Sequence, residues 1–152
     1  MTRTLIVGVG NADRGDDAAG IEVARGLRAL IGDAARVVEH ADGGLGLIEL
    51  WSEEDSVVVV DAVSSGGKAG RVHRIDALAG PLRAKSSGAS THGFGIGDAI
   101  ELARTLGRLP RRLVVFGIEG QRYDPGAPLS PEVAAAVGDV IDAVREELDE
   151  HA

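Results

Sequence analysis

The sequence contains no cysteine, and this absence removes several kinds of chemistry at once. Without thiols the chain forms no disulfide framework, and it has no thiolate to serve as a nucleophile or as a metal ligand. Aromatic residues are also scarce, at 3% of the chain, so the core must be built from Val, Leu, Ile and Ala. A catalytic or metal-binding site in this chain therefore depends on other side chains.

The sequence also lacks an excess of positive charge, and it has no long apolar run. The formal net charge is −8, which makes nucleic acid a poor partner and favours cations or a basic stretch of another protein. No apolar run approaches the ~20 residues of a transmembrane helix. The opening Met-Thr-Arg leads directly into a strand-like run that is too short for a signal sequence. We therefore expect a cytoplasmic protein with no membrane insertion.

What the sequence does contain is a regular alternation of strand and helix patterns. A length of 152 residues, with 44% hydrophobic and 26% charged residues, suits a single domain spanning residues 1–152. Apolar runs predict strands at residues 4–9, 36–40, 56–63, 71–75 and 112–118. Helical spacing predicts helices at residues 16–30, 45–51, 96–106 and 130–147, the last with Ser130 as its N-cap and Pro131 in its first turn.

This alternation predicts an α/β fold, a three-layer α/β/α sandwich around a mostly parallel sheet of about five strands. The run at 71–75 follows a Gly- and Ser-rich turn at 64–70, which is too short for a crossover connection. Its alternating pattern indicates a half-exposed strand. These features favour an antiparallel hairpin and one antiparallel edge strand.

The first strand runs into a glycine-rich loop that does not fit a nucleotide. A dinucleotide fingerprint needs glycine at the position that Asp13 holds. A P-loop needs Lys and then Ser or Thr after its last glycine, whereas Gly15 is followed by Asp16 and Asp17. Two acids at a helix start repel the phosphate that would bind there. Both nucleotide interpretations therefore fail on charge.

The acids in and near this loop suggest another kind of site. Asp16 alone is explained by helix capping, which would stabilise the helix start by roughly 0.3–2 kcal/mol. If the first strand lies beside the strand at 56–63, their carboxyl ends open into one crevice, and Asp17 and Asp61 converge there. His92, after a long loop of small residues, is a third candidate. One histidine and two carboxylates form a set that suits a borderline divalent metal ion.

Several of these patterns also have a purely structural explanation. His92 on its own is more often a surface or capping histidine. Asp42-Gly43-Gly44 is explained equally well as a turn or as a backbone-lined channel for a peptide. His40 and His73 are expected to be ordinary sheet residues, and His151 to lie in the frayed tail. No Gly-x-Ser-x-Gly elbow is present, so a serine hydrolase is not expected.

Six motifs follow one another along the chain: Gly8-Val9-Gly10-Asn11, Asp16-Asp17-Ala18-Ala19-Gly20, Asp42-Gly43-Gly44, Val60-Asp61-Ala62, Thr91-His92-Gly93 and Leu129-Ser130-Pro131. Taken together, they resemble those of the hydrogenase maturation proteases, the endopeptidases that trim the large subunit of nickel–iron hydrogenases. The resemblance covers nearly the whole chain in the same order, and it implies an α/β/α sandwich.

The resemblance implies a specific activity. A large-subunit precursor that already holds its nickel–iron centre loses its C-terminal extension by one cleavage. The resemblance implies that Asp17, Asp61 and His92 contact the metal and act in catalysis. A metal-polarised water or carbonyl then supplies the attack, and a carboxylate handles the proton.

Other residues enter as supporting ones. The resemblance aligns Asp16 with the acid beside the metal-facing one, and Asp16 and Asn11 are kept as supporting residues. Asp42, Gly43 and Gly44 are kept as candidates for a substrate channel because of their position at the mouth of the crevice. Nickel is expected to arrive with the substrate, because three mixed ligands hold a metal weakly in the free enzyme, and other divalent ions can substitute. Residues 64–70 and 81–90 match no family motif and are expected to select the partner.

Two other functions stay open at this point. A noncatalytic nickel chaperone or insertion factor for hydrogenase assembly would bind metal tightly as an isolated chain and leave the mass of its partner unchanged. A spore-germination-type protease would combine a similar fold and acids with a small acid-soluble protein as substrate. The identity of the substrate separates the two proteases.

Overall fold

A computed structural model describes residues 4–41, 44–52, 55–80 and 95–150 of the chain. The strands are β1 (Thr4–Val9), β2 (Arg36–His40), β3 (Ser56–Val63), β4 (Val72–Asp76) and β5 (Arg112–Glu119). The α-helices are α1 (Ala19–Ile31), α2 (Ile96–Thr105) and α3 (Pro131–Glu150). Three short 3₁₀ helices complete the secondary structure of these residues: η1 (Gly15–Ala18), η2 (Gly32–Ala34) and η3 (Leu45–Leu50).

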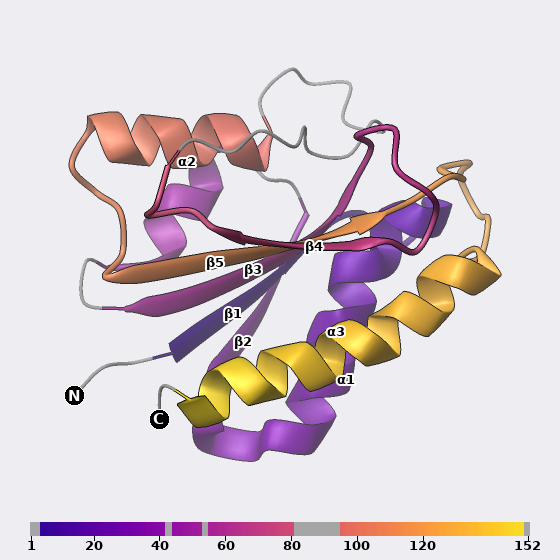
Figure 1. The fold of residues 1–152 in the computed structure, drawn as a ribbon, viewed down its shortest axis with the longest axis horizontal. Coiled ribbons are helices and arrows are strands. Elements are labelled where there is room, and N and C mark those ends of the chain that lie inside the picture. Colours follow the sequence, from indigo (N-terminus) through magenta and orange to yellow (C-terminus); the bar gives the residue numbers. More distant parts are fainter. Residues whose placement is uncertain (1–3, 42–43, 53–54, 81–94, 151–152) are drawn as a thin grey trace.

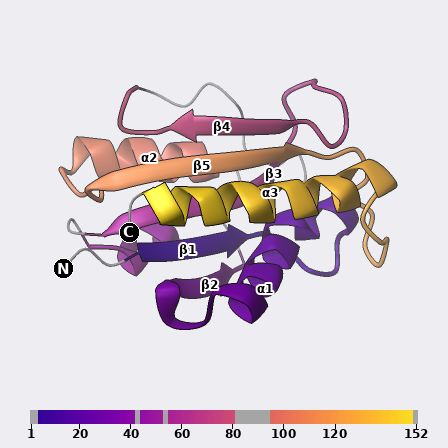
Figure 2. The same cartoon turned by 60° about the horizontal axis from the view of Figure 1, so that its bottom comes forward.

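All five strands form one sheet in the order β2-β1-β3-β5-β4. The pairs β1–β2, β1–β3 and β3–β5 are parallel, and β4 runs antiparallel to β5 at the sheet edge, as the opposed arrows in Figure 2 show. The strand order reverses at β1 and β3, so the switch point lies between these two neighbours. The mostly parallel sheet with one antiparallel edge strand confirms the fold class expected from the sequence.

The connection of the edge strand differs from the prediction. The turn after β3 was expected to make a hairpin that pairs β4 with β3. Instead β5 lies between them, with Val63 opposite Glu119 on one side and Val72 opposite Ile118 on the other. The hairpin is therefore wrong, because the more apolar β5 takes the place beside β3 and leaves the half-polar β4 at the edge, where its outer face meets solvent.

Helices cover both faces of the sheet (Figure 1). Side chains from α2 and η3 pack on one face with Val57, Val59 and Leu113. Side chains from α1 and α3 pack on the other face with Val58 and Val60. Alternate residues of β3 thus enter opposite cores, which is why this strand is buried along its whole length and has a continuous apolar run.

The helices follow the predicted positions with two differences. The helix expected from residue 16 begins as the 3₁₀ helix η1 and becomes α-helical only at Ala19. The helix expected at 45–51 is the single 3₁₀ segment η3. None of the helices in the described part of the chain combines the length and apolarity that crossing a bilayer requires.

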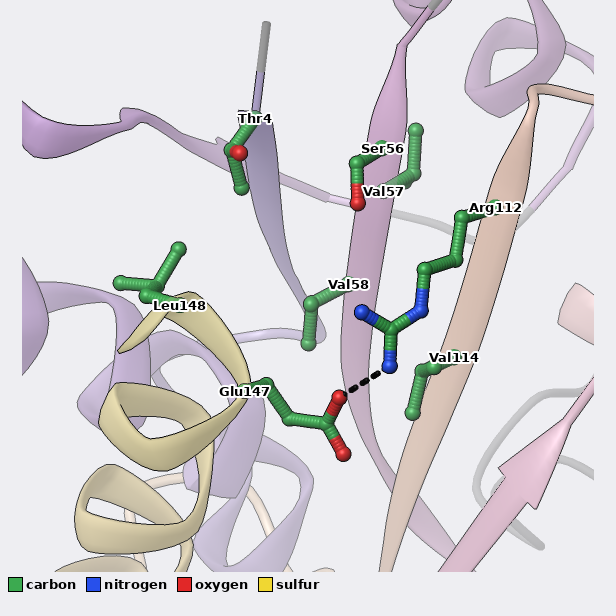
Figure 3. Close-up of a pocket in the computed structure, with 8 residues that line it drawn as sticks. All are labelled: Thr4, Ser56, Val57, Val58, Arg112, Val114, Glu147 and Leu148. Atoms are coloured by element: carbon green, nitrogen blue, oxygen red, sulfur yellow. Dashed lines mark hydrogen bonds and ion pairs between the residues drawn. The ribbon is translucent and has the colours of Figure 1, made fainter. Parts of the chain in front are cut away.

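At the amino ends of β3 and β5, the last helix is anchored to the sheet. Glu147 of α3, only 8% exposed, accepts bonds from Arg74 Nε and Arg112, each at 2.5 Å. Figure 3 shows the Arg112 contact beside a cavity of about 10 Å³, which holds one water molecule at most. This end therefore anchors the last helix and leaves no room for a substrate in that cavity.

Candidate active site

The opposite end of the sheet, where β1 and β3 finish, holds the acids that the sequence singles out. The chain turns sharply after β1 at Gly10, whose φ is 147°. A Cβ atom at Gly10 would lie 1.9 Å from the carbonyl oxygen of Asp17, so only glycine fits there. The Gly10 N–H donates to the His40 carbonyl at 3.1 Å, which fixes this turn to the end of β2. The glycine thus brings Asp17 close to the strand end.

Asn11 sets the position of the Asp17 side chain. The Asn11 N–H donates to Asp17 Oδ2 at 3.1 Å, and Asn11 Oδ1 accepts from the Asp13 N–H at 2.9 Å. The second bond is a local turn of the kind that asparagine favours. Asn11 is therefore a supporting residue for Asp17 by direct contact.

Asp61 lies on β3 and is only 4% exposed. Burial and then the negative charge of Asp17 raise the pKa of the Asp61 carboxyl well above its ordinary value, and a backbone hydrogen bond from Ala62 opposes this only in part. The two acids that the sequence predicted to converge are thus near enough to repel. Their catalytic and metal-binding roles stay predictions.

Asp16 does not cap a helix, so the capping interpretation is wrong. Its carboxylate is fully buried and accepts bonds from the Gln121 and Arg122 N–H groups, each at 2.9 Å. It also accepts from the backbone N–H and the hydroxyl of Ser130, each at 2.7 Å. Burial opposes ionisation, but these four bonds lower the pKa of Asp16 below its ordinary value. Asp16 therefore ties the loop of residues 120–130 to the first loop.

Sequence reasoning missed a further buried acid, Glu119, at the end of β5. It is 1% exposed and accepts from Ser65 and from His73 Nε2, the latter at 3.2 Å. Its only sequence signal is a charge that follows the apolar run of residues 113–118 in this strand. His73, expected to be an ordinary sheet residue, is instead held by this carboxylate, and the hydroxyl of Ser65 has a buried acid as its acceptor.

Tyr123 was also missed. Its hydroxyl donates to the Val63 carbonyl at 3.2 Å, so it spans from the 120–130 loop to the end of β3. Burial and the charges of the surrounding carboxylates raise its pKa to about 12. The phenol therefore stays a neutral donor across the pH range in which enzymes work.

Several predicted residues cannot be placed in this site. His92, Asp42, Gly43 and His151 fall outside the described residues. The carbonyl of Gly44 accepts from the Leu47 N–H at 3.0 Å at the start of η3. Among the residues that the structure describes, no three His, Asp or Glu side chains group closely enough to hold a metal ion.

The acid pair nevertheless suits a divalent cation. Asp61 is buried and Asp17 is partly exposed, so both cannot ionise at low cost, and a shared cation relieves their repulsion. Oxygen ligands with a histidine are acceptable to several divalent metals. Asp17 and Asp61 would hold such an ion from the described part of the chain.

Solved structures share this fold and define its class. The solution structure of an endopeptidase from Escherichia coli matches with a TM-score of 0.78 and 26% identity, covering 99% of this chain and 94% of that one. The hydrogenase maturating endopeptidase HybD from E. coli matches with a TM-score of 0.77, 24% identity and coverage of 99% and 94%. The fold is therefore that of endopeptidases with an α/β/α sandwich.

Sequence comparisons make the class specific. The family model for hydrogenase maturation protease matches residues 21–147, which include Asp61 and His92 and begin after Asp17. The hydrogenase expression/formation protein HupD of Rhodobacter capsulatus is 31% identical, over 95% of this chain and 70% of that protein. The hydrogenase 2 maturation protease of E. coli is 25% identical, over 93% and 88%. This chain belongs to the hydrogenase maturation protease family, and it is a peptidase of hydrogenase maturation.

Proposed function

We propose that this peptidase removes the C-terminal extension of a hydrogenase large-subunit precursor, and that nickel already held by the precursor is what its acid pair recognises. The observation that carries the proposal is the buried Asp61 carboxyl, whose pKa is raised by burial and by Asp17. No positive charge from the described residues contributes to the pKa shift of Asp61, so the acid pair at the carboxyl ends of β1 and β3 suits a cation supplied from outside. His92 is proposed as the third contact.

The acid pair also suits the proton transfers of peptide hydrolysis. A carboxyl with a raised pKa gives and takes a proton closer to neutral pH than an ordinary aspartate does. Nickel bound by the precursor supplies Lewis-acid activation of the water or the scissile carbonyl. In the free chain, burial and then the negative charge of Asp17, which Asn11 holds, keep the pKa of Asp61 high. Bound nickel favours the ionised form, so Asp61 then acts as the base that takes the proton of the attacking water and passes it to the leaving amine. This assigns an aspartate-type, metal-dependent mechanism.

The same arrangement would act as a checkpoint. A precursor without nickel offers the acid pair no cation. The peptidase then does not hold the precursor's extension at Asp61, and the extension is not cut. Supply of the metal by the substrate fits the small described ligand set, since two carboxylates alone bind a divalent ion weakly. Cleavage then reports that metal insertion is complete.

The proposal is tested by incubating the chain with nickel-loaded precursor and measuring the intact mass of the large subunit. Wild type is expected to release one C-terminal fragment, and Asp61→Asn and His92→Ala to release none while keeping the wild-type circular dichroism spectrum. Asp13→Asn, an exposed acid on the first loop, is the matched control and should cut normally. An unchanged precursor mass together with tight nickel binding by the isolated chain would instead identify a chaperone or insertion factor.

A further inference from the structure

The pair of buried Glu119 and partly exposed His73 has no part in the proposed chemistry, yet it lies on the face that carries Asp61. Asp61 is paired with Gly117 across β3 and β5, and Gly117 is paired with His73 across β5 and β4. Residues opposite one another in a sheet project to the same face. Asp61 and His73 thus stand in one row, with a glycine between them.

The spacing of this row matches a bound peptide. Two strand spacings separate the backbones of Asp61 and His73, which is about 10 Å. An extended peptide rises about 3.3 Å per residue, so this distance spans about three residues. A chain that lies across the strand ends with one residue at Asp61 would therefore place a nearby residue at His73.

Glu119 fixes which nitrogen of a neutral His73 ring carries the hydrogen. Burial opposes ionisation of Glu119, but hydrogen bonds from Ser65 and His73 lower the pKa of its carboxyl below the ordinary value. An ionised carboxylate only accepts hydrogen bonds, so His73 Nε2 must carry the hydrogen. In the neutral ring Nδ1 is then an acceptor. The His73 side chain keeps 27% of its surface exposed, so a partner can reach it.

Glu119 also holds the loop beside His73. The Ser65 N–H and hydroxyl both donate to its carboxylate, and the Gly70 N–H donates to its carbonyl at 2.8 Å. A Cβ atom at Gly67 would lie 3.0 Å from the Glu119 side chain, so the loop closes tightly around it. In metal sites, a carboxylate that accepts from one ring nitrogen commonly orients the histidine for the contact made by the other nitrogen, and Glu119 holds the His73 ring in the same way.

We infer that His73 is a substrate-binding residue, oriented by Glu119, whose Nδ1 accepts a hydrogen bond from a main-chain N–H of the precursor about three residues from the one at Asp61. Glu119 is the positioning residue. The inference rests on the proposed function for the identity of the bound chain, since it requires that the precursor lies across the strand ends.

The test measures binding and cleavage separately. The dissociation constant is measured by calorimetry with the active-site acids intact, using a nickel-loaded precursor whose scissile peptide bond is replaced by an uncleavable isostere, with and without a change at His73. His73→Phe is expected to weaken binding by about tenfold, roughly the loss of one hydrogen bond in a desolvated place. His73→Gln, which keeps both a donor for Glu119 and an acceptor, is expected to restore binding to within about threefold of the parent. The control Arg71→Gln, an exposed neighbour, should leave it unchanged.

Glu119→Gln gives a second, independent measurement. Glu119→Gln should weaken binding because it loosens the His73 ring. The double variant with His73→Phe should therefore have a dissociation constant no larger than that of whichever single variant binds less tightly. Equal binding by the parent and His73→Phe, or full additivity of the two changes, would overturn the inference. Failure of the wild type to cut a precursor that it binds through His73 would overturn the proposed function alone.

Discussion

The carboxylate of Asp16 accepts two hydrogen bonds from Ser130, one from the backbone N–H and one from the hydroxyl, each at 2.7 Å. The two residues are 114 positions apart in the chain. Their contact joins the loop after β1 to the residue before α3, and the Asp16 N–H donates to the Arg122 carbonyl at 2.7 Å beside it. The acid next to the proposed metal contact thus holds the frame of the site together.

Asp16→Asn is therefore expected to destabilise the fold by about 2–3 kcal/mol, because an amide presents its own donor to buried donors and leaves some of them unpaired. The measurement is the free energy of unfolding in urea. Asp13→Asn, on the same loop but exposed, should change stability by less than about 0.5 kcal/mol. Similar unfolding midpoints for the two variants would contradict the structural role of Asp16.

Asp61 should make the fold less stable as the pH rises. Its pKa is raised in the folded chain, so between the ordinary value of 3.8 and the folded value the folded chain binds more protons than the unfolded one. Stability from this group is present at low pH and is lost as the pH rises through that window. Asp61→Asn, in chelator-treated protein, should therefore be more stable than wild type at pH 7, by about 1.4 kcal/mol for each pH unit that the window spans below pH 7.

The comparison at low pH is the control for Asp61. Wild type and Asp61→Asn should converge in stability below the ordinary pKa of aspartate, where both side chains are neutral. A variant that is less stable than wild type at pH 7 would show that the charge of Asp61 is compensated within the free chain.

Tyr123 is the only tyrosine, so its titration can be followed directly by ultraviolet absorbance. Burial and then the charges of Asp16, Asp17, Glu119 and Asp61 raise its pKa to about 12, so the folded chain should show a midpoint there. In guanidinium chloride the midpoint should return to about 10. The folded state therefore loses stability as the pH rises from about 10 towards about 12. A native midpoint near the unfolded one would place the phenol away from the acids.

Glu147 should be a major anchor of α3. Replacing it by Gln removes the charge that Arg74 and Arg112 share, and the expected loss is about 1–3 kcal/mol, since both arginines keep partial contact with solvent. Glu146→Gln, the exposed neighbour on the same helix, is the matched control. Urea unfolding of the two variants measures the difference, and equal midpoints would rule out the anchor.

The sequence predicts the elements that local pattern controls. The valine run of β3, the strands at Thr4–Val9 and Arg36–His40, and the Ser130–Pro131 helix start all lie where expected. The pairing of β4 with β5 was not predictable in this way, because pairing partners depend on contacts between distant segments. Residue spacing alone favoured the nearer strand, β3.

The contacts of the candidate site also fall into those that the sequence predicts and those that it does not. Asp17 and Asp61 could be brought together from sequence because parallel strands finish at a common edge. The bonds from Asp16 to residues 121–130 and from Glu119 to Ser65 and His73 could not, since each joins positions far apart in the chain and depends on how a loop folds back. In the sequence Asp16 has the pattern of a helix cap. Only the folded loop shows that its carboxylate oxygens accept hydrogen bonds from residues 121–130.

The central claim is that the acid pair recognises nickel on the substrate, and the intact mass of the large subunit tests it most directly. The chain is incubated with precursor that carries nickel and, in parallel, with precursor prepared without it. We predict a single loss of mass, equal to the C-terminal extension, in the nickel-loaded sample only. Equally efficient cleavage of the nickel-free precursor would contradict the claim.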